Sequence, residues 1–231
     1  MTSNDRGATG GVLNEARSNK ESPVAGVAVP DTNLAVETTE LVRDTTSDLV
    51  YQHSRRVFFF GSLQGRNRGL SFDAELLYVG AMLHDLGLNP EFHGSGRRFE
   101  IDSAEEARRF LQARGVPEDS VRRVWTAIAL HTTPGIPEHM EPEVALVTAG
   151  VEYDVLGIGY HDIGVRARAE VTTRHPRPDF KSQILQTFTD GMADKPDTTF
   201  GTVNADVLEH FVPEFRRRDF VETIETSPWP E

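Results

Sequence analysis

A histidine and an aspartate stand side by side at the end of an uncharged stretch of this sequence. Residues 76–83 carry no charge and run directly into His84 and Asp85, and Gly87 follows two positions later. The stretch predicts a buried helix over about 73–86. An ionisable pair at the end of such a helix is costly to bury unless it is paired or binds a metal. The pair alone leaves both interpretations open, a hydrogen-bonded buried histidine and a metal site.

Three further metal-competent side chains lie on the apolar faces of other predicted helices. His53 lies on one stripe, His131 follows Ile128 by three positions on a second, and Asp154 extends a third. Four helices that each place His or Asp toward the core would need four separate buried partners. If the helices converge, the side chains can instead satisfy one another around one divalent cation with nitrogen and oxygen ligands. The periodicity therefore favours a shared metal site.

Composition limits the other classes of function. The 231 residues carry a formal net charge of −12, with 38% hydrophobic and 26% charged residues, as in a soluble globular protein. This charge argues against non-specific binding to nucleic acid or to an anionic membrane. The chain has no cysteine, so any metal must be held by histidines and carboxylates. No apolar run approaches a membrane span and no signal peptide is evident, so we expect a cytoplasmic protein.

The periodic segments indicate an all-α fold. Residues 1–33 read as a disordered tail and 34–231 as a single domain. A long irregular segment is expected from about 157 to 178, and the last residues should be frayed. No strand-like alternation extends beyond a few residues. Helices are predicted to begin near residues 34, 47, 73, 103, 118, 142, 180 and 203.

Several polar residues outside the metal stripes have two interpretations. Arg97 and Arg98 could bind a substrate phosphate or carboxylate, but a solvated loop is favoured. Glu100 and Asp102 could face the pocket, but capping of the fourth helix is favoured. Four histidines are expected to be solvated loop residues, of which His139 could help His131 to hold a second metal: His93, His139, His161 and His175.

His53, His84–Asp85 and Asp154 together resemble the H…HD…D pattern of the HD-domain superfamily of metal-dependent hydrolases. The resemblance covers about residues 36–160 and implies an α-helical bundle that holds one divalent metal ion. It implies His53, His84, Asp85 and Asp154 as the metal ligands. Residues 161–231 would then be a C-terminal extension with additional helices.

A finer resemblance is to the cyanamide hydratase branch, whose members add water to a small nitrile to give urea. The similar segments are "QHSRRVFFFG", "LLYVGAMLHDLG", "RFEIDSAEEA" and "AIALHTTPGI". The branch implies zinc as the favoured ion, with iron and manganese as alternatives, and a histidine at the position of His131 beside the metal. Asp85 would ligate the ion and accept the proton of its water. His131 could be a fifth ligand, a proton shuttle or an electrostatic stabiliser.

We therefore expect a metal-dependent hydrolase or hydro-lyase that activates water against a small molecule, with a nitrile-like substrate first. The alternative is a phosphohydrolase acting on a nucleotide or another phosphate ester. Its pocket needs several cations near the metal, and the candidates are Arg55, Arg56, Arg97 and Arg98. A catalytically silent module with a structural ion is the third possibility. No nucleic acid or membrane partner is expected, and the extra C-terminal helices suit a homodimer interface.

Overall fold

The computed structural model of the chain describes residues 21–229, and this range is all-α, as predicted. Short 3-10 turns connect several helices, and the one isolated β-bridge in the described range joins Val24 and Val27. No described helix combines the length and apolar character that crossing a membrane requires. The ten α-helices of the described range are α1 Asn33–Thr45, α2 Asp48–Asn67, α3 Ala74–Leu83, α4 Phe99–Gln112, α5 Glu118–Leu130, α6 Pro142–Leu156, α7 Val165–Arg174, α8 Phe180–Met192, α9 Asn204–Phe211 and α10 Phe220–Glu225.

Local sequence signals fix the ends of the helices that carry the expected metal residues. The Ser47 side chain accepts a hydrogen bond from the backbone of Val50 at the start of α2, and Asp73 caps α3 in the same way. Pro142 occupies the first position of α6, where its missing N–H costs nothing. Gly157 ends α6 in the left-handed conformation, at φ 73°.

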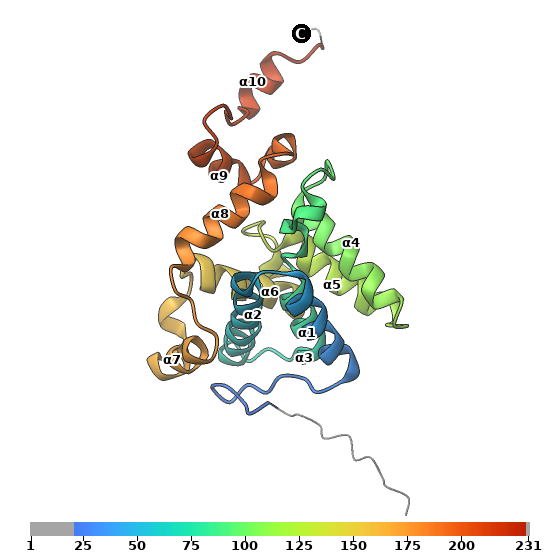
Figure 1. Cartoon of the computed structure of the whole chain (residues 1–231), viewed down its shortest axis with the longest axis vertical. Coiled ribbons are helices and arrows are strands. Elements are labelled where there is room, and N and C mark those ends of the chain that lie inside the picture. The colour runs from blue at the N-terminus through green and yellow to red at the C-terminus, as the bar shows by residue number, and fades with distance from the viewer. Residues whose placement is uncertain (1–20, 230–231) are drawn as a thin grey trace, which may run out of the picture.

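Helices α2 and α6 form the centre of the bundle and pack unusually close together (Figure 1). Two glycines allow this approach, one on each helix. A Cβ atom at Gly61 would lie 2.6 Å from the carbonyl oxygen of Leu146, and one at Gly150 would lie 2.3 Å from that of Val57. Because no larger residue fits at either position, the glycines set the distance between His53 on α2 and Asp154 on α6.

Helices α8 and α9 lie over one end of this bundle, and α10 projects beyond them (Figure 1). A second apolar cluster joins this C-terminal layer to the body. Its buried members are Leu88 and Phe99 from the body with Met192 and Leu208 from the extension. The extension is therefore packed onto the end of the bundle where the His84–Asp85 pair lies.

Some segments differ from the sequence-based prediction. The predicted irregular segment contains a helix, α7, whose single fully buried residue is Val171, so its apolar stripe is too narrow to show in the sequence. Helix α4 begins at Phe99, not near residue 103, and α10 occupies part of the end predicted to be frayed. Part of the predicted tail is ordered, because Val24 and Val27 are buried; residues 1–20 lie outside the described residues. The division of the remaining chain into core and extension stays a prediction.

Candidate metal centre

His53, His84 and Asp85 form a buried cluster whose ligand atoms face one another. The Nε2 atoms of His53 and His84 lie 3.2 Å apart. Asp85 Oδ2 lies 3.1 Å from Nε2 of His84 and 3.7 Å from Nε2 of His53. All three side chains are at most 1% exposed. These residues come from α2 and from the end of α3, where His84 is the first residue beyond the helix.

Each histidine at this site uses its other ring nitrogen to contact an oxygen. Nδ1 of His53 lies 2.7 Å from Asp154 Oδ2, Nδ1 of His84 lies 2.8 Å from the Ala81 carbonyl, and Nδ1 of His131 lies 2.6 Å from the Ile128 carbonyl. A carbonyl oxygen can only accept, so Nδ1 carries the proton in the neutral rings of His84 and His131. The Nε2 lone pairs are thereby left for the centre, which is the usual arrangement of metal-binding histidines.

The Asp85 carboxylate is the polar group that most needs a partner. Both of its oxygens are buried, and neither has a hydrogen-bond partner among the described residues. His131 approaches from the opposite side, with Nε2 3.5 Å from Asp85 Oδ1. A buried carboxylate without hydrogen bonds, facing lone pairs of imidazoles, is costly unless a cation lies between them. The cluster therefore fits a divalent metal ion held by nitrogen and oxygen atoms, although this donor set does not select among zinc, iron and manganese.

Asp154 lies beside the cluster and contacts it through Nδ1 of His53. Besides the Nδ1 contact, its carboxylate accepts hydrogen bonds from Nε and Nη2 of Arg56, at 2.8 Å to Oδ1 and 2.9 Å to Oδ2. Arg56 is fully buried and also donates to the Pro176 carbonyl. In this geometry Asp154 orients His53 and neutralises Arg56. Its predicted role as a fourth ligand stays a prediction.

The pKa shifts resolved at the centre favour anionic Asp85 and Asp154 and a neutral His53. Burial lowers the pKa of His53, and the charge of Asp154 only partly offsets this. Burial alone would raise the pKa of Asp85, but the neighbouring His84 and His131 hold it well below its usual value. Burial would likewise raise the pKa of Asp154, yet the contacts with His53 and then with Arg56 lower it to about 2. Neutral histidines and ionised carboxylates are the protonation states that bind metals.

Aromatic rings from the extension and from α4 close the centre. The Phe180 ring at the start of α8 lies 5.3 Å from the His53 ring, and the Phe99 ring lies 5.5 Å from that of His131. Phe188 of α8 then packs on Phe99. The face of the cluster toward α8 is consequently apolar and shielded from water.

The four cations that a phosphate-binding pocket would require are already paired with carboxylates. Arg55 contacts Glu21 at 2.5 Å, and Arg56 contacts Asp154. The same holds in the loop before α4, where Arg97 pairs with Asp102 at 2.8 Å and Arg98 with Glu100 at 3.0 Å. Arg97 and Arg98 keep 47% and 34% of their side chains exposed, so the favoured solvated loop also carries two ion pairs.

Glu100 and Asp102 do not cap α4, because both are fully buried inside its first turn. Glu100 accepts hydrogen bonds from Thr132 and Asn204, and Asp102 from Lys195 at 3.0 Å. Both carboxylates thus fasten the C-terminal extension to the first turn of α4. The sequence analysis could not identify these roles of Glu100 and Asp102. Their partners Lys195 and Asn204 are 93 and 104 positions away, and helical periodicity does not indicate such contacts.

Among the loop histidines, His175 is buried rather than solvated. Its Nδ1 lies 2.9 Å from Gln52 Oε1, its ring stacks on Phe59, and its Nε2 is buried without a hydrogen-bond partner in the described range. Burial, and then the charges of nearby arginines, lower its pKa to about 3. His139 is exposed and, among the described residues, has an ion pair with Glu138; the second metal site considered from the sequence stays a prediction.

Comparison with known families agrees with this geometry. Residues 50–154 match the HD domain. The matched segment begins on α2 just before His53, ends at Asp154, and contains every residue of the centre. The match supports membership of the HD-domain superfamily, whose members are usually metal-dependent hydrolases. A search of curated proteins finds no relative that matches the chain.

Proposed function

We propose that this HD domain is a hydratase or hydrolase that activates water against a small, uncharged molecule, with a nitrile such as cyanamide as the first substrate. The observation that carries the proposal is the Asp85 carboxylate, which is buried without hydrogen bonds between the Nε2 atoms of three histidines. A divalent ion bound there would lower the pKa of a water molecule and polarise a substrate atom.

The residues around the cluster then have separate tasks. His53 and His84 would hold the ion through Nε2, while Asp154 and the Ala81 carbonyl fix the orientation of the two rings. One oxygen of Asp85 faces His84 and the other faces His131, so one can bind the ion while the other accepts a proton from water. His131 lies beside that second oxygen and would pass the proton to the substrate nitrogen.

The surroundings support a small substrate of low charge. Phe99 and Phe180 pack against the histidine rings and exclude water. The arginines that could neutralise a phosphate are engaged with carboxylates instead. Addition of water to cyanamide requires no anion site: the oxygen adds to the nitrile carbon, both protons reach nitrogen, and the product is urea.

The alternative, a phosphohydrolase, rests on the HD-domain match, because phosphate-ester hydrolysis is the other chemistry expected of this superfamily. The two functions are separated by assaying urea formed from cyanamide beside phosphate released from a panel of mononucleotides, using protein loaded with zinc, iron or manganese. We expect urea and no phosphate. Phosphate release without turnover of cyanamide would replace the first proposal by the second, and no activity with any ion would overturn both.

A substitution of His131 tests its role in the same assay. His131→Gln should lower turnover far more than ion affinity if the imidazole moves a proton, whereas equal losses would make it a ligand.

A further inference from the structure

A cleft outside the metal centre gathers cations in an otherwise acidic protein. It has a volume of about 500 Å³ and lies between the end of α6, α7 and the segment that leads into α8. Asp154 is the one residue of the centre that lines it; His53, His84, Asp85 and His131 do not. Six lining residues carry the argument below: Phe60, Leu156, Tyr160, Arg168, Arg177 and Lys181.

Three of these residues are cations, and the cleft has a single carboxylate to balance them, whose Oδ1 lies 3.4 Å from Nε of Arg177. The only lining carboxylate, Asp154, is already held by Arg56 from behind. Lys181 is exposed and has no ion pair with any described residue. Arg168 is held in place by the Tyr160 and Ile163 carbonyls, which bind its Nη1 alone. Its other nitrogens remain available to a ligand.

Arg177 is held at the cleft by Asp154 and Phe180. Its Nη2 donates to the Asp154 carbonyl at 2.6 Å, and its guanidinium lies over the Phe180 ring at 4.6 Å. Its Nε is buried and lies 3.4 Å from Asp154 Oδ1, an ion pair without a hydrogen bond. Its Nη1 has no hydrogen bond with the described residues and is the nitrogen that can donate to an oxyanion in the cleft.

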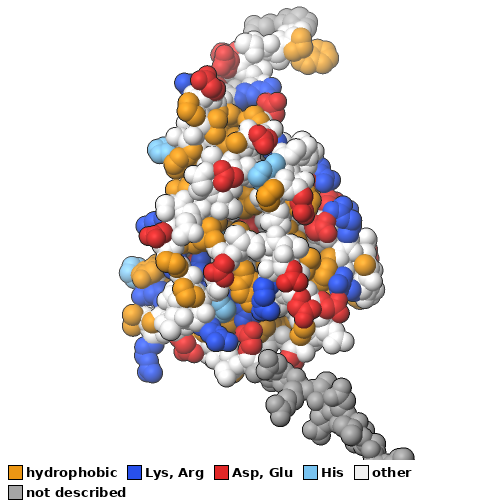
Figure 2. Space-filling view, viewed as in Figure 1, with side chains coloured by type: hydrophobic (Ala, Val, Ile, Leu, Met, Phe, Trp, Pro, Cys, Tyr) orange, Lys and Arg blue, Asp and Glu red, His pale blue; other side chains and the backbone are white. Residues whose placement is uncertain are grey.

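Apolar side chains line another part of the cleft. Phe60 contributes its floor, and Leu156 and Val165 at its rim are 64% and 69% exposed. Figure 2 shows Lys and Arg side chains among apolar ones at the lower left of the molecule, over α7. The volume is in the usual range for small-molecule sites, about 300–1,000 Å³. A ligand that fits has an anionic head and an apolar body.

We propose that this cleft binds a small organic phosphate, with the phosphate at Arg168, Arg177 and Lys181 and the apolar body against Phe60 and Leu156. Three cations match a dianionic phosphate monoester better than a carboxylate, which carries one charge. The site is independent of the proposed reaction, because the cluster residues His53, His84, Asp85 and His131 do not line it. Its link to the centre is Arg177, which contacts the same Asp154 that orients His53.

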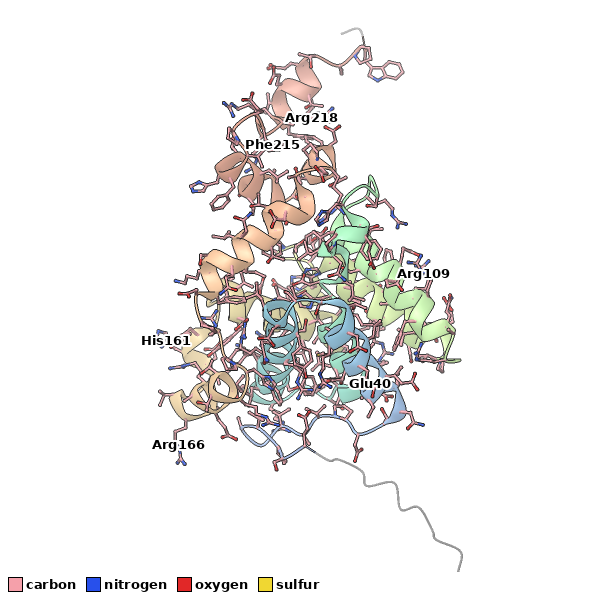
Figure 3. The ribbon with its side chains drawn as sticks, viewed as in Figure 1. Glu40, Arg109, His161, Arg166, Phe215 and Arg218 are labelled. Carbon is pink, nitrogen blue, oxygen red and sulfur yellow. The ribbon has the colours of Figure 1, made fainter. Side chains whose placement is uncertain are left out.

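The test is calorimetric titration of phenyl phosphate, inorganic phosphate and phenol into the full chain loaded with a divalent ion. Phenyl phosphate should bind saturably and more tightly than inorganic phosphate, and phenol should not bind. Lys181→Glu should weaken binding by about tenfold or more, the expected value of one charged contact. Arg166→Glu is the matched control, because Arg166 lies on α7, projects into solvent and does not line the cleft (Figure 3).

Asp85→Asn distinguishes this cleft from the metal centre. The variant should bind phenyl phosphate as tightly as the unaltered chain, even where it loses all turnover. The proposal is overturned if neither phosphate binds saturably, if Arg166→Glu weakens binding as much as Lys181→Glu, or if Asp85→Asn abolishes binding. Equal affinity for phenyl phosphate and inorganic phosphate would refute the proposed contact of the apolar body with Phe60 and Leu156.

Discussion

Asp154→Asn is the substitution that most directly tests the geometry of the metal centre. Asparagine has the shape of aspartate and retains one oxygen that can accept the His53 Nδ1–H, but it loses the charge that pairs with Arg56. If Asp154 acts through His53, the variant should keep an ion site and hold the ion about 10- to 100-fold more weakly. If Asp154 is itself a ligand, the loss should be as large as in Asp85→Asn.

The same substitution should lower stability by an amount that the structure allows us to estimate. Removing one partner of a buried ion pair leaves the other charge uncompensated and costs about 3–5 kcal/mol. Arg56 retains its bond to the Pro176 carbonyl at 2.8 Å, so we expect the lower end, about 3 kcal/mol. For a domain of this size, that corresponds to a Tm lower by about 6–12 °C.

The two effects are measured separately. Ion affinity is measured by competition with a chelator, and stability by urea unfolding of the metal-free protein. Asp162→Asn serves as the control, because Asp162 is exposed on the turn after α6 and has no part in the cluster. Unchanged ion affinity in Asp154→Asn, or complete loss of the ion, would each refute the inferred orienting role.

Three further predictions concern stabilisation by the ion, the packing at Gly150 and the titration of His175. At an ion concentration of about 100 Kd, the ion should stabilise the protein by about 2.7 kcal/mol, raising Tm by about 5–11 °C, and Asp85→Asn should abolish this shift in differential scanning calorimetry. Gly150→Ala should cost at least about 2 kcal/mol in urea unfolding, since its Cβ would clash with the Val57 carbonyl, whereas Gly94→Ala, in open space, should cost almost nothing. His175 has a pKa of about 3 in the folded protein and about 6.5 when unfolded, so the unfolded chain takes up the proton first and stability falls as the pH drops below 6.5. His175→Asn should reduce the loss between pH 7.5 and 5 by up to about 2 kcal/mol, and an unchanged pH profile would contradict this.

The parts of the fold that the sequence predicts are those whose signal is local. The helices that carry His53, His131 and Asp154 show wide apolar stripes and clear ends, such as Ser47 before α2 and Gly157 after α6. Helix α7 shows neither, because one buried valine makes no stripe. Convergence of the stripes could be inferred because four polar residues on core faces need a common partner. That inference requires no knowledge of how the helices are ordered in space.

The sequence could not show whether Asp154 binds the ion directly or only orients His53. His53 and Asp154 are 101 positions apart, and helical periodicity gives the face of a side chain but not the direction of a ring nitrogen. The position of Arg56 favours the orienting role of Asp154. Arg56 lies three residues after His53, one helical turn along α2, and its guanidinium binds the Asp154 carboxylate. An arginine one turn from a metal-binding histidine, on a helix with no nearby acid in sequence, must find its carboxylate elsewhere in the core. In this chain it finds Asp154, and a carboxylate that neutralises a buried arginine has less charge to offer a metal ion. That competition is why ion affinity should depend on Asp85 much more than on Asp154.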